Sequence, residues 1–153
     1  METLDEPELT AIFNYRRLSE RLATSGQPGE AELGAIARAG FEVVINLALH
    51  DCEGAPPDER RTVEGLGMTY EHIPVVWQHP APADLEAFFS AMDRHAGRAV
   101  YVHCAANLRV SAFMLLYRVI RLGWRLEDAL PDLQAIWQPD DTWQAFIDAA
   151  LAG

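Results

Sequence analysis

The segment from Arg98 to Leu122 constrains the fold most, because in it only a short loop separates an apolar strand from an apolar helix. Residues 98–103 form an apolar run that predicts a strand, and residues 111–122 predict an apolar helix. Cys104 opens the loop between them. Where a strand leads into a helix in this way, backbone N–H groups converge, bind oxyanions and favour a thiolate. The sequence therefore predicts an oxyanion site with Cys104 at its floor.

Around this segment the chain alternates predicted strands with predicted helices. The predicted strands are residues 18–24 (at an edge), 41–47, 68–76 and 98–103. The predicted helices are residues 30–39, 57–66, 84–95, 111–122, 126–137 and 142–151. Such alternation is typical of a three-layer α/β domain, with a central, largely parallel sheet flanked by helices. Sites in such sheets lie at the carboxyl ends of strands, where Cys104 falls.

Composition narrows the classes of partner and of chemistry. The chain has 153 residues, half of them apolar, so we expect one domain over residues 1–153 with a substantial core. A formal net charge of −11 argues against nucleic acid or an anionic membrane as the main partner, since both bind basic surfaces. All 12 basic residues are arginine, and without lysine neither a Walker-type nucleotide site nor a Schiff base is available.

The two cysteines, Cys52 and Cys104, are expected to be reduced thiols in the cytoplasm. No apolar run approaches the ~20 residues of a membrane span, and the acidic start of the chain is unlike a signal peptide. Without a secretory signal, two cysteines do not suggest a disulfide framework. Residues 50–53 contain potential metal ligands but no second cluster at a recognised spacing, so we expect a solvated loop there and no metal.

The run HCAANLRVS, residues 103–111, resembles the signature of the cysteine-dependent protein tyrosine and dual-specificity phosphatases. In that signature His-Cys is followed by five residues, an arginine, and a serine or threonine. The order of LATSGQP (22–28), FEVVINL (41–47) and YEHIPV (70–75) is similar to a small bacterial branch. That branch includes the phosphatase-like domain of beta-lactamase-hydrolase-like proteins, and the resemblance covers roughly residues 12–125.

This resemblance implies a phosphatase-type fold and hydrolysis of phosphate monoesters, without a cofactor. The substrate would be a phosphoprotein or a small phosphoester. Cys104 would be the nucleophile, Arg109 the phosphate-binding arginine, and Ser111 the hydroxyl that eases breakdown of a cysteinyl-phosphate. His103 would hold the backbone of the loop. Substrate contacts are expected from Ala105, Ala106, Asn107, Leu108, Val110 and Trp77. Trp77 would either form a wall of the substrate pocket or pack against its own loop.

Arg109 departs from this signature, since it is the fifth residue after Cys104 instead of the sixth. Either the loop is one residue shorter than in the family, or Arg109 and Val110 have exchanged places in a loop of the usual length. We favour the second alternative, because it keeps the loop length and leaves Ser111 at the usual hydroxyl position. Arg109 then leaves the loop at a different angle, so its side chain can miss a bound phosphate. Asn107 replaces a frequent glycine and is the next-best residue for positive φ.

The general acid of the family, an aspartate early in the loop after the strand that matches IPVVW, has no direct counterpart here. The nearest candidates are His79 and Asp84. Asp84 directly precedes an amphipathic helix and is more typical of a residue that begins or caps it. His79 could donate a proton at neutral pH or could be a solvated loop residue. Losing acid assistance typically costs about 10²–10⁴ in rate, so slow turnover is an open alternative.

Two other classes of protein fit parts of the pattern. Rhodanese-type sulfurtransferases also present a loop cysteine before a helix, commonly with an arginine at the spacing of Arg109. A binding module without turnover would keep the oxyanion site alone. Cys52 is expected to be an ordinary loop cysteine, and the alternative is a resolving thiol for oxidised Cys104. The sequence predicts no oligomeric state.

Overall fold

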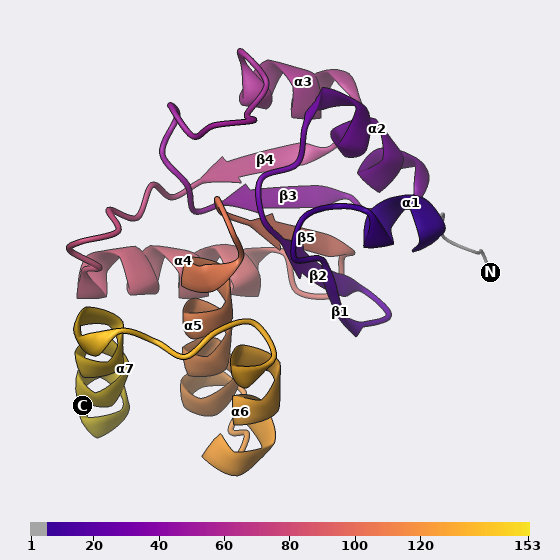
Figure 1. Cartoon of the computed structure of the whole chain (residues 1–153). Helices are drawn as coiled ribbons and strands as arrows, with labels where there is room; N and C mark the ends of the chain where they lie inside the picture. The colour runs from indigo at the N-terminus through magenta and orange to yellow at the C-terminus, as the bar shows by residue number, and fades with distance from the viewer. Residues whose placement is uncertain (1–5) are drawn as a thin grey trace.

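Figure 1 shows the computed structural model of the chain, which describes residues 6–153. A five-stranded sheet in the order β1-β2-β5-β3-β4 forms its centre. The strands are β1 (Arg16–Ser19), β2 (Leu22–Ser25), β3 (Val43–Asn46), β4 (Thr69–His72) and β5 (Val100–His103). β1 pairs with β2 antiparallel, whereas the β2–β5, β3–β5 and β3–β4 pairs are parallel. The largely parallel sheet that the sequence predicts is confirmed.

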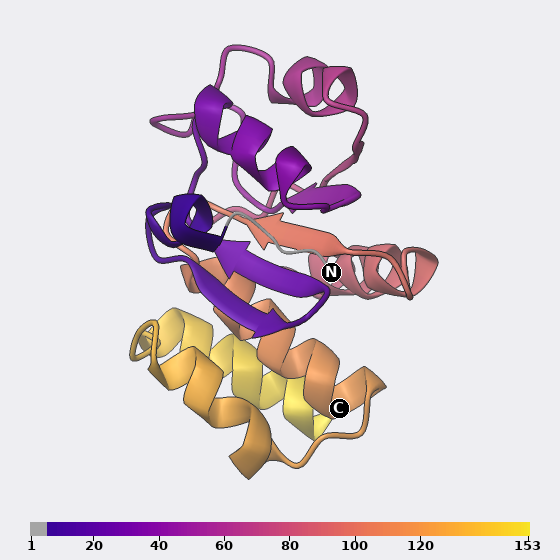
Figure 2. The ribbon, with the colours of Figure 1, turned by 90° about the vertical axis from the view of Figure 1, so that its right-hand side faces the viewer.

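Helices cover both faces of the sheet (Figures 1 and 2). One face carries α1 (Glu6–Thr10), α2 (Glu30–Arg38) and α3 (Glu59–Gly65). The other carries α4 (Pro82–Arg94) and α5 (Leu108–Leu116), with α6 (Leu126–Gln134) and α7 (Asp141–Ala152) packed on α5. A π-helical segment, Tyr117–Arg121, continues α5. The predicted three-layer α/β architecture is therefore confirmed.

The central strands β3 and β5 are buried on both faces, because successive side chains of a strand point to opposite sides of the sheet. Val43, Ile45 and Val102 join a core with helices α4 to α7. Val44 and Tyr101, from the same two strands, join a second core with α1, α2 and α3. This double burial explains why both strands are nearly continuous apolar runs in the sequence.

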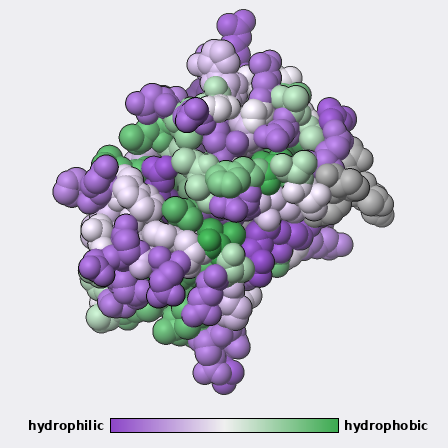
Figure 3. Space-filling model, in the orientation of Figure 1, coloured by the Kyte–Doolittle hydropathy of each residue, from purple (hydrophilic) through white to green (hydrophobic). Residues whose placement is uncertain are grey.

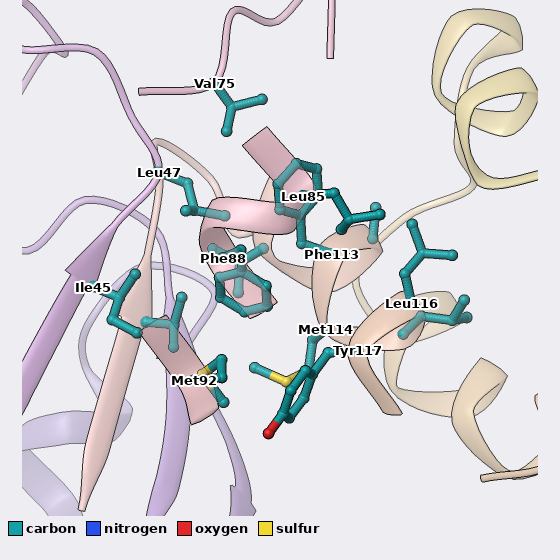
Figure 4. Packing of buried hydrophobic residues seen from close by; sticks show 14 of the residues in the cluster. Ile45, Leu47, Val75, Leu85, Phe88, Met92, Phe113, Met114, Leu116 and Tyr117 are labelled. Carbon is teal, nitrogen blue, oxygen red and sulfur yellow. The ribbon is translucent and has the colours of Figure 1, made fainter. Parts of the chain in front are cut away.

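Aromatic rings fill the core between the sheet and helices α4 and α5 (Figure 4). The ring centroid of Phe88 lies 5.8 Å from that of Phe113 and 6.1 Å from that of Tyr117. Ile45 and Leu47 project from the sheet side toward these rings. Such close contacts anchor α5 against the sheet, next to the strand that leads into it.

The edges of the sheet differ from the sequence prediction. A single strand over residues 18–24 is wrong, because Glu20 and Arg21 form a turn and the flanking residues pair as the hairpin of β1 and β2. β2 therefore lies inside the sheet, beside β5, and β1 is the edge strand. The strand predicted over residues 68–76 is also shorter, since β4 ends at His72. Within residues 6–153, no helix has both the length and the apolar character that a membrane crossing requires.

A partly buried charge cluster joins β1 to α6. Arg118, which is 4% exposed, donates to Asp132 Oδ2 (2.6 Å), and Arg16 Nε donates to Asp132 Oδ1 (2.8 Å). Burial acts to raise the pKa of the Asp132 carboxyl, but the two arginines outweigh it and hold that pKa below its usual value. A carboxyl with a lowered pKa stabilises the fold above its ordinary pKa, and this contribution is lost as the pH falls.

We expect Asp132→Asn to lower the free energy of unfolding at neutral pH by about 1–3 kcal/mol, because buried Arg118 loses its anionic partner. Urea denaturation at neutral and acidic pH measures this effect. The difference from wild type should shrink as the pH falls below the ordinary pKa of an aspartate carboxyl, about 3.9, because the stabilisation by the ionised carboxylate is then progressively lost. Asp148→Asn, at an exposed carboxylate of α7, is the matched control and should change little. Equal stability of Asp132→Asn and wild type would contradict this role.

Candidate active site

Cys104 lies at the carboxyl end of β5, in the middle of the sheet. Because β5 runs parallel to β2 and β3, the segments that follow all three strands meet at this edge. Cys104 is fully buried, and its N–H donates to Ser25 O at the end of β2 (3.4 Å). In Figure 3 hydrophobic residues gather near the centre of the face seen in Figure 1, and hydrophilic residues surround them. The structure thus places the thiol at the edge where the sequence predicts it.

The loop after Cys104 has its carbonyl groups tied to a neighbouring segment of the chain. Ala105 O accepts a hydrogen bond from Gln27 N (3.0 Å), and Ala106 O accepts one from Asn14 Nδ2 (2.9 Å). In a planar trans peptide the C=O and the following N–H point in opposite directions. The N–H group of Ala106 therefore points away from Gln27.

Helix α5 begins at Leu108, directly after this loop. The first N–H groups of a helix have no partner within the helix and carry its positive dipole end. Several N–H groups at this point have no hydrogen-bond partner within the described residues. We call them the cradle; they belong to Ala105, Ala106, Leu108, Arg109 and Val110. Such unpaired N–H groups at a helix N-terminus are what an oxyanion binds.

Asn107 ends the loop and starts the helix. Its φ is +69°, in the left-handed region that asparagine tolerates better than most residues. The side-chain Nδ2 donates to Asn14 O and Thr24 Oγ1, both at 2.9 Å, and Ser111 N donates to Asn107 O (3.0 Å). This anchored turn lets the helix begin three residues before the predicted start at residue 111.

Gly26 allows the segment after β2 to lie directly against the loop. A Cβ atom at this position would meet Ala105 O at 2.7 Å and Phe13 Cδ2 at 2.8 Å. One of these contacts is with backbone, so a side chain would force the loop to move. The run LATSGQP contains this glycine, but its sequence alone does not reveal the close contact with the loop.

The Arg109 side chain borders the hollow in front of the cradle. This hollow, of about 210 Å³, is lined by Trp77, Ala105, Ala106, Leu108 and Arg109. Arg109 Nη1 donates to Val75 O (2.8 Å), and the guanidinium carbon lies 6.0 Å from the ring centroid of Trp77. Arg109 is thus held beside the cradle, whereas Val110 is fully buried in the core.

Trp77 forms an aromatic wall of this hollow and is held by the C-terminal helices. Its ring centroid lies 5.4 Å from those of both Trp137 and Trp143. Trp143, fully buried on α7, also donates from Nε1 to Trp77 O (3.0 Å). The segment after β4 is therefore fixed by residues far along the chain, a role that the sequence did not reveal.

Ser111 does not meet the thiol. Its hydroxyl donates to Leu108 O (2.8 Å) and accepts from Trp137 Nε1 (3.0 Å), and no hydrogen bond within the described residues joins it to Cys104. A serine in a helix commonly bonds back to a carbonyl of the preceding turn in this way. The hydroxyl that the resemblance assigns to breakdown of a cysteinyl-phosphate is thus directed to Leu108 and Trp137.

Neither candidate acid lines the hollow. Asp84 belongs to the first turn of α4, and its Oδ2 accepts from Ala81 N (3.3 Å), the capping contact that its sequence position favours. His79 is exposed on a turn closed by its own N–H and Val76 O (3.1 Å). Of the residues that line the hollow, Arg109 alone is ionisable.

Cys52 is half-buried on the loop after β3. Burial raises the pKa of its thiol, Arg109 opposes this, and the nearby Cys104 adds to it. A raised pKa makes a thiol less reactive at neutral pH.

Within residues 6–153, the structure brings together no group of three His, Cys, Asp or Glu side chains that could hold a metal ion.

Comparison with known proteins supports the sequence resemblance. No protein-family model matches the chain. The "Beta-lactamase hydrolase-like protein" of Xylella fastidiosa (strain Temecula1 / ATCC 700964) is 34% identical over 106 residues, which are 67% of this chain and 24% of that protein. The chain therefore spans about a quarter of the length of the curated relatives that it matches.

Solved structures match almost the whole chain. The "Putative phosphatase (DUF442)" of Shewanella putrefaciens CN-32 is 37% identical, with a TM-score of 0.84 over 95% of this chain and 96% of that chain. Tk-PTP in its active form is 22% identical, with a TM-score of 0.76 over 90% of this chain and 95% of that chain, and shows the fold alone. The phosphatase-type fold that the sequence predicts is confirmed.

We expect Gly26→Ala to displace the cysteine loop, because the new methyl group would overlap Ala105 O. Overpacking of this kind typically costs about 1–3 kcal/mol in the free energy of unfolding. Urea denaturation measures that loss, and thermal shifts in inorganic phosphate measure anion binding by the cradle. Gly65→Ala, which adds a methyl group in open space, is the control. It should keep both the wild-type free energy of unfolding and the phosphate-dependent thermal shift. A Gly26→Ala variant as stable as wild type, with the same phosphate-dependent shift, would contradict the close packing.

Proposed function

The chain belongs to the DUF442 family of phosphatase-like proteins, and from this premise we propose that it hydrolyses phosphate monoesters through a cysteinyl-phosphate intermediate. The observation that carries the proposal is that unpaired N–H groups of the cradle and the Arg109 side chain lie together at one hollow, directly after the buried Cys104 in the chain. A thiolate, oriented amide donors and a guanidinium are what in-line transfer of a phosphoryl group needs.

Arg109 and the cradle bind the phosphoryl group in this proposal. A guanidinium has five N–H donors in a rigid fork. Only Nη1 has a protein acceptor, Val75 O, within the described residues, and this bond orients the rest of the fork for phosphoryl oxygens. Backbone N–H groups of the cradle take the other oxygens. Charge that develops on these oxygens is thus met by donors that are already in place.

The Cys104 thiolate attacks phosphorus in line, and the bond from phosphorus to the leaving oxygen breaks. Water then attacks the cysteinyl-phosphate, which releases inorganic phosphate and restores the thiolate. Since the hydroxyl of Ser111 is engaged by Leu108 and Trp137, we assign that residue to the structure of the α5 N-terminus. The proposed setting is the cytoplasm, where a thiol nucleophile stays reduced.

We propose His79 as the group that protonates the leaving group, from a turn that lies outside the lining of the hollow. It sits on an exposed turn near Trp77, and no side-chain hydrogen bond within the described residues holds it. The Asp84 carboxylate, by contrast, caps α4 through Ala81 N. Trp77 would contact the apolar part of a phosphoprotein or small phosphoester in the hollow.

Hydrolysis of a generic aryl phosphate tests this proposal. We expect turnover by wild type, none by Cys104→Ser, and a loss of about 10²–10³ in kcat for Arg109→Ala, the cost typical of one oxyanion donor. His79→Ala should lower the rate by about 10²–10⁴ for substrates with poor leaving groups. Cys104→Ser should keep the thermal shift in phosphate, which shows that its fold and anion site persist.

Other outcomes would identify the alternatives. Phosphate-dependent stabilisation without hydrolysis by wild type would indicate a binding module. Cyanolysis of thiosulfate, with a persulfide on Cys104 and no aryl phosphate hydrolysis, would indicate a sulfurtransferase. The spacing of Arg109 from Cys104 is the observation that makes the second assay worthwhile.

A further inference from the structure

A buried side-chain pair, His103 and Glu59, lies directly behind the cysteine loop, and the proposed mechanism does not use it. His103 is fully buried and Glu59 is 8% exposed. His103 Nε2 lies 2.5 Å from Glu59 Oε2, and His103 Nδ1 lies 3.3 Å from Cys104 O. The pair connects the end of β5 to the first residue of α3, across 44 positions of the sequence.

Both ring nitrogens of His103 face groups that only accept hydrogen bonds. A carbonyl oxygen carries no proton, and an ionised carboxylate carries none either. The second carboxylate oxygen, Glu59 Oε1, accepts from Gln27 Nε2 (2.9 Å), so both Glu59 oxygens are used as acceptors. A ring that donates from both nitrogens is an imidazolium.

The environment of Glu59 supports its ionised form. Burial acts to raise the pKa of the Glu59 carboxyl, but the hydrogen bonds and charge of His103, with the Gln27 amide, outweigh it and leave that pKa below its usual value. Isolated buried charges are costly, whereas an opposite charge in contact offsets that cost. A paired, doubly hydrogen-bonded carboxylate meets this condition.

We propose that Glu59 is a positioning residue for the Cys104 thiolate, because its carboxylate keeps the buried His103 ring doubly protonated beside the backbone of the cysteine loop. The ring lies between the carboxylate and the loop, so the positive side of the pair faces Cys104. A cation at this place favours the thiolate over the thiol.

The same contacts also orient the loop. Gln27 donates from its side chain to Glu59 and from its backbone to Ala105 O, while His103 donates to Cys104 O. The carbonyl groups of Cys104 and Ala105 are thereby held on one side of the loop. The N–H groups of Ala105 and Ala106 therefore point to the opposite side. Glu59 thus contacts both residues that hold the loop, while its charge acts on the thiol through His103 alone.

Other ionisable groups lie near the thiol or near Glu59, and their effect must be separated from that of the His103–Glu59 pair. Cys52, on the loop after β3, interacts with Cys104, and Arg109 and Asp51 act on Cys52 in turn. His72, from β4, acts on Glu59. None of them bonds to His103 within the described residues. Glu59→Gln removes the negative charge while it keeps the size and an acceptor oxygen, so it isolates the charge of the pair.

The first test observes His103 directly. The chain has five histidines, so ¹⁵N NMR of the imidazole nitrogens can resolve each ring, and His103→Gln assigns the signal. At about pH 7.5, a free imidazole is neutral, but we expect His103 to carry protons on both nitrogens in wild type and on one in Glu59→Gln. A single protonated nitrogen in wild type would overturn the proposal. This result does not depend on turnover, so it stands apart from the test of the proposed function.

The second test follows the thiolate of Cys104. Its ultraviolet absorbance is measured against pH as the difference between chains with Cys104 and with Cys104→Ser, both in a Cys52→Ser background. We expect Glu59→Gln to move the midpoint to higher pH by about one unit, a tenfold loss of thiolate at low pH. Gln27→Ala is the matched control, since it removes a hydrogen bond to Glu59 but leaves the charged pair, and its midpoint should stay with wild type. If Glu59→Gln lowered thermal stability alone and left the midpoint unchanged, Glu59 would be only structural.

Discussion

The contact between the backbone of Gln27 and Ala105 O is the interaction on which the candidate site depends. It turns a carbonyl of the cysteine loop away from the hollow and leaves the next N–H group facing the opposite side. Gly26 makes the contact possible, because any side chain there would overlap Ala105 O. Asn107 completes the arrangement by adopting positive φ and starting α5 at Leu108. These backbone contacts alone present the unpaired N–H groups that the proposed anion site uses, before any side chain contributes.

The sheet order explains how these segments come together. β5 lies between β2 and β3 and runs parallel to both, so the segment that contains Gly26 and the loop that contains Cys52 flank Cys104. Helix α3 adds Glu59 behind the loop, and α7 fixes the opposite wall through Trp143. Each layer of the domain therefore supplies one contact to the same strand end.

Much of this arrangement could be predicted from the sequence, because it is local. Apolar runs indicate strands buried on both faces, and the short loop before an apolar helix indicates an oxyanion site at Cys104. The hairpin of β1 and β2 was missed, since a polar turn at Glu20 and Arg21 interrupts what looks like one strand. The direction of the Ser111 hydroxyl depends on Trp137, 26 residues away, and the partner of His103 is 44 residues away. Periodicity carries no information on such pairs.

A crystal structure of the protein with orthovanadate tests the central claim most directly, since vanadate takes the geometry of a phosphoryl group in transfer. The account predicts a vanadate bonded to Cys104 Sγ, with its oxygens on the cradle N–H groups and on Arg109, while Val75 O still accepts from Nη1. The loop carbonyls of Ala105 and Ala106 should keep their present partners. An empty cradle with vanadate bound elsewhere, or a loop whose carbonyls turn toward the hollow, would contradict it.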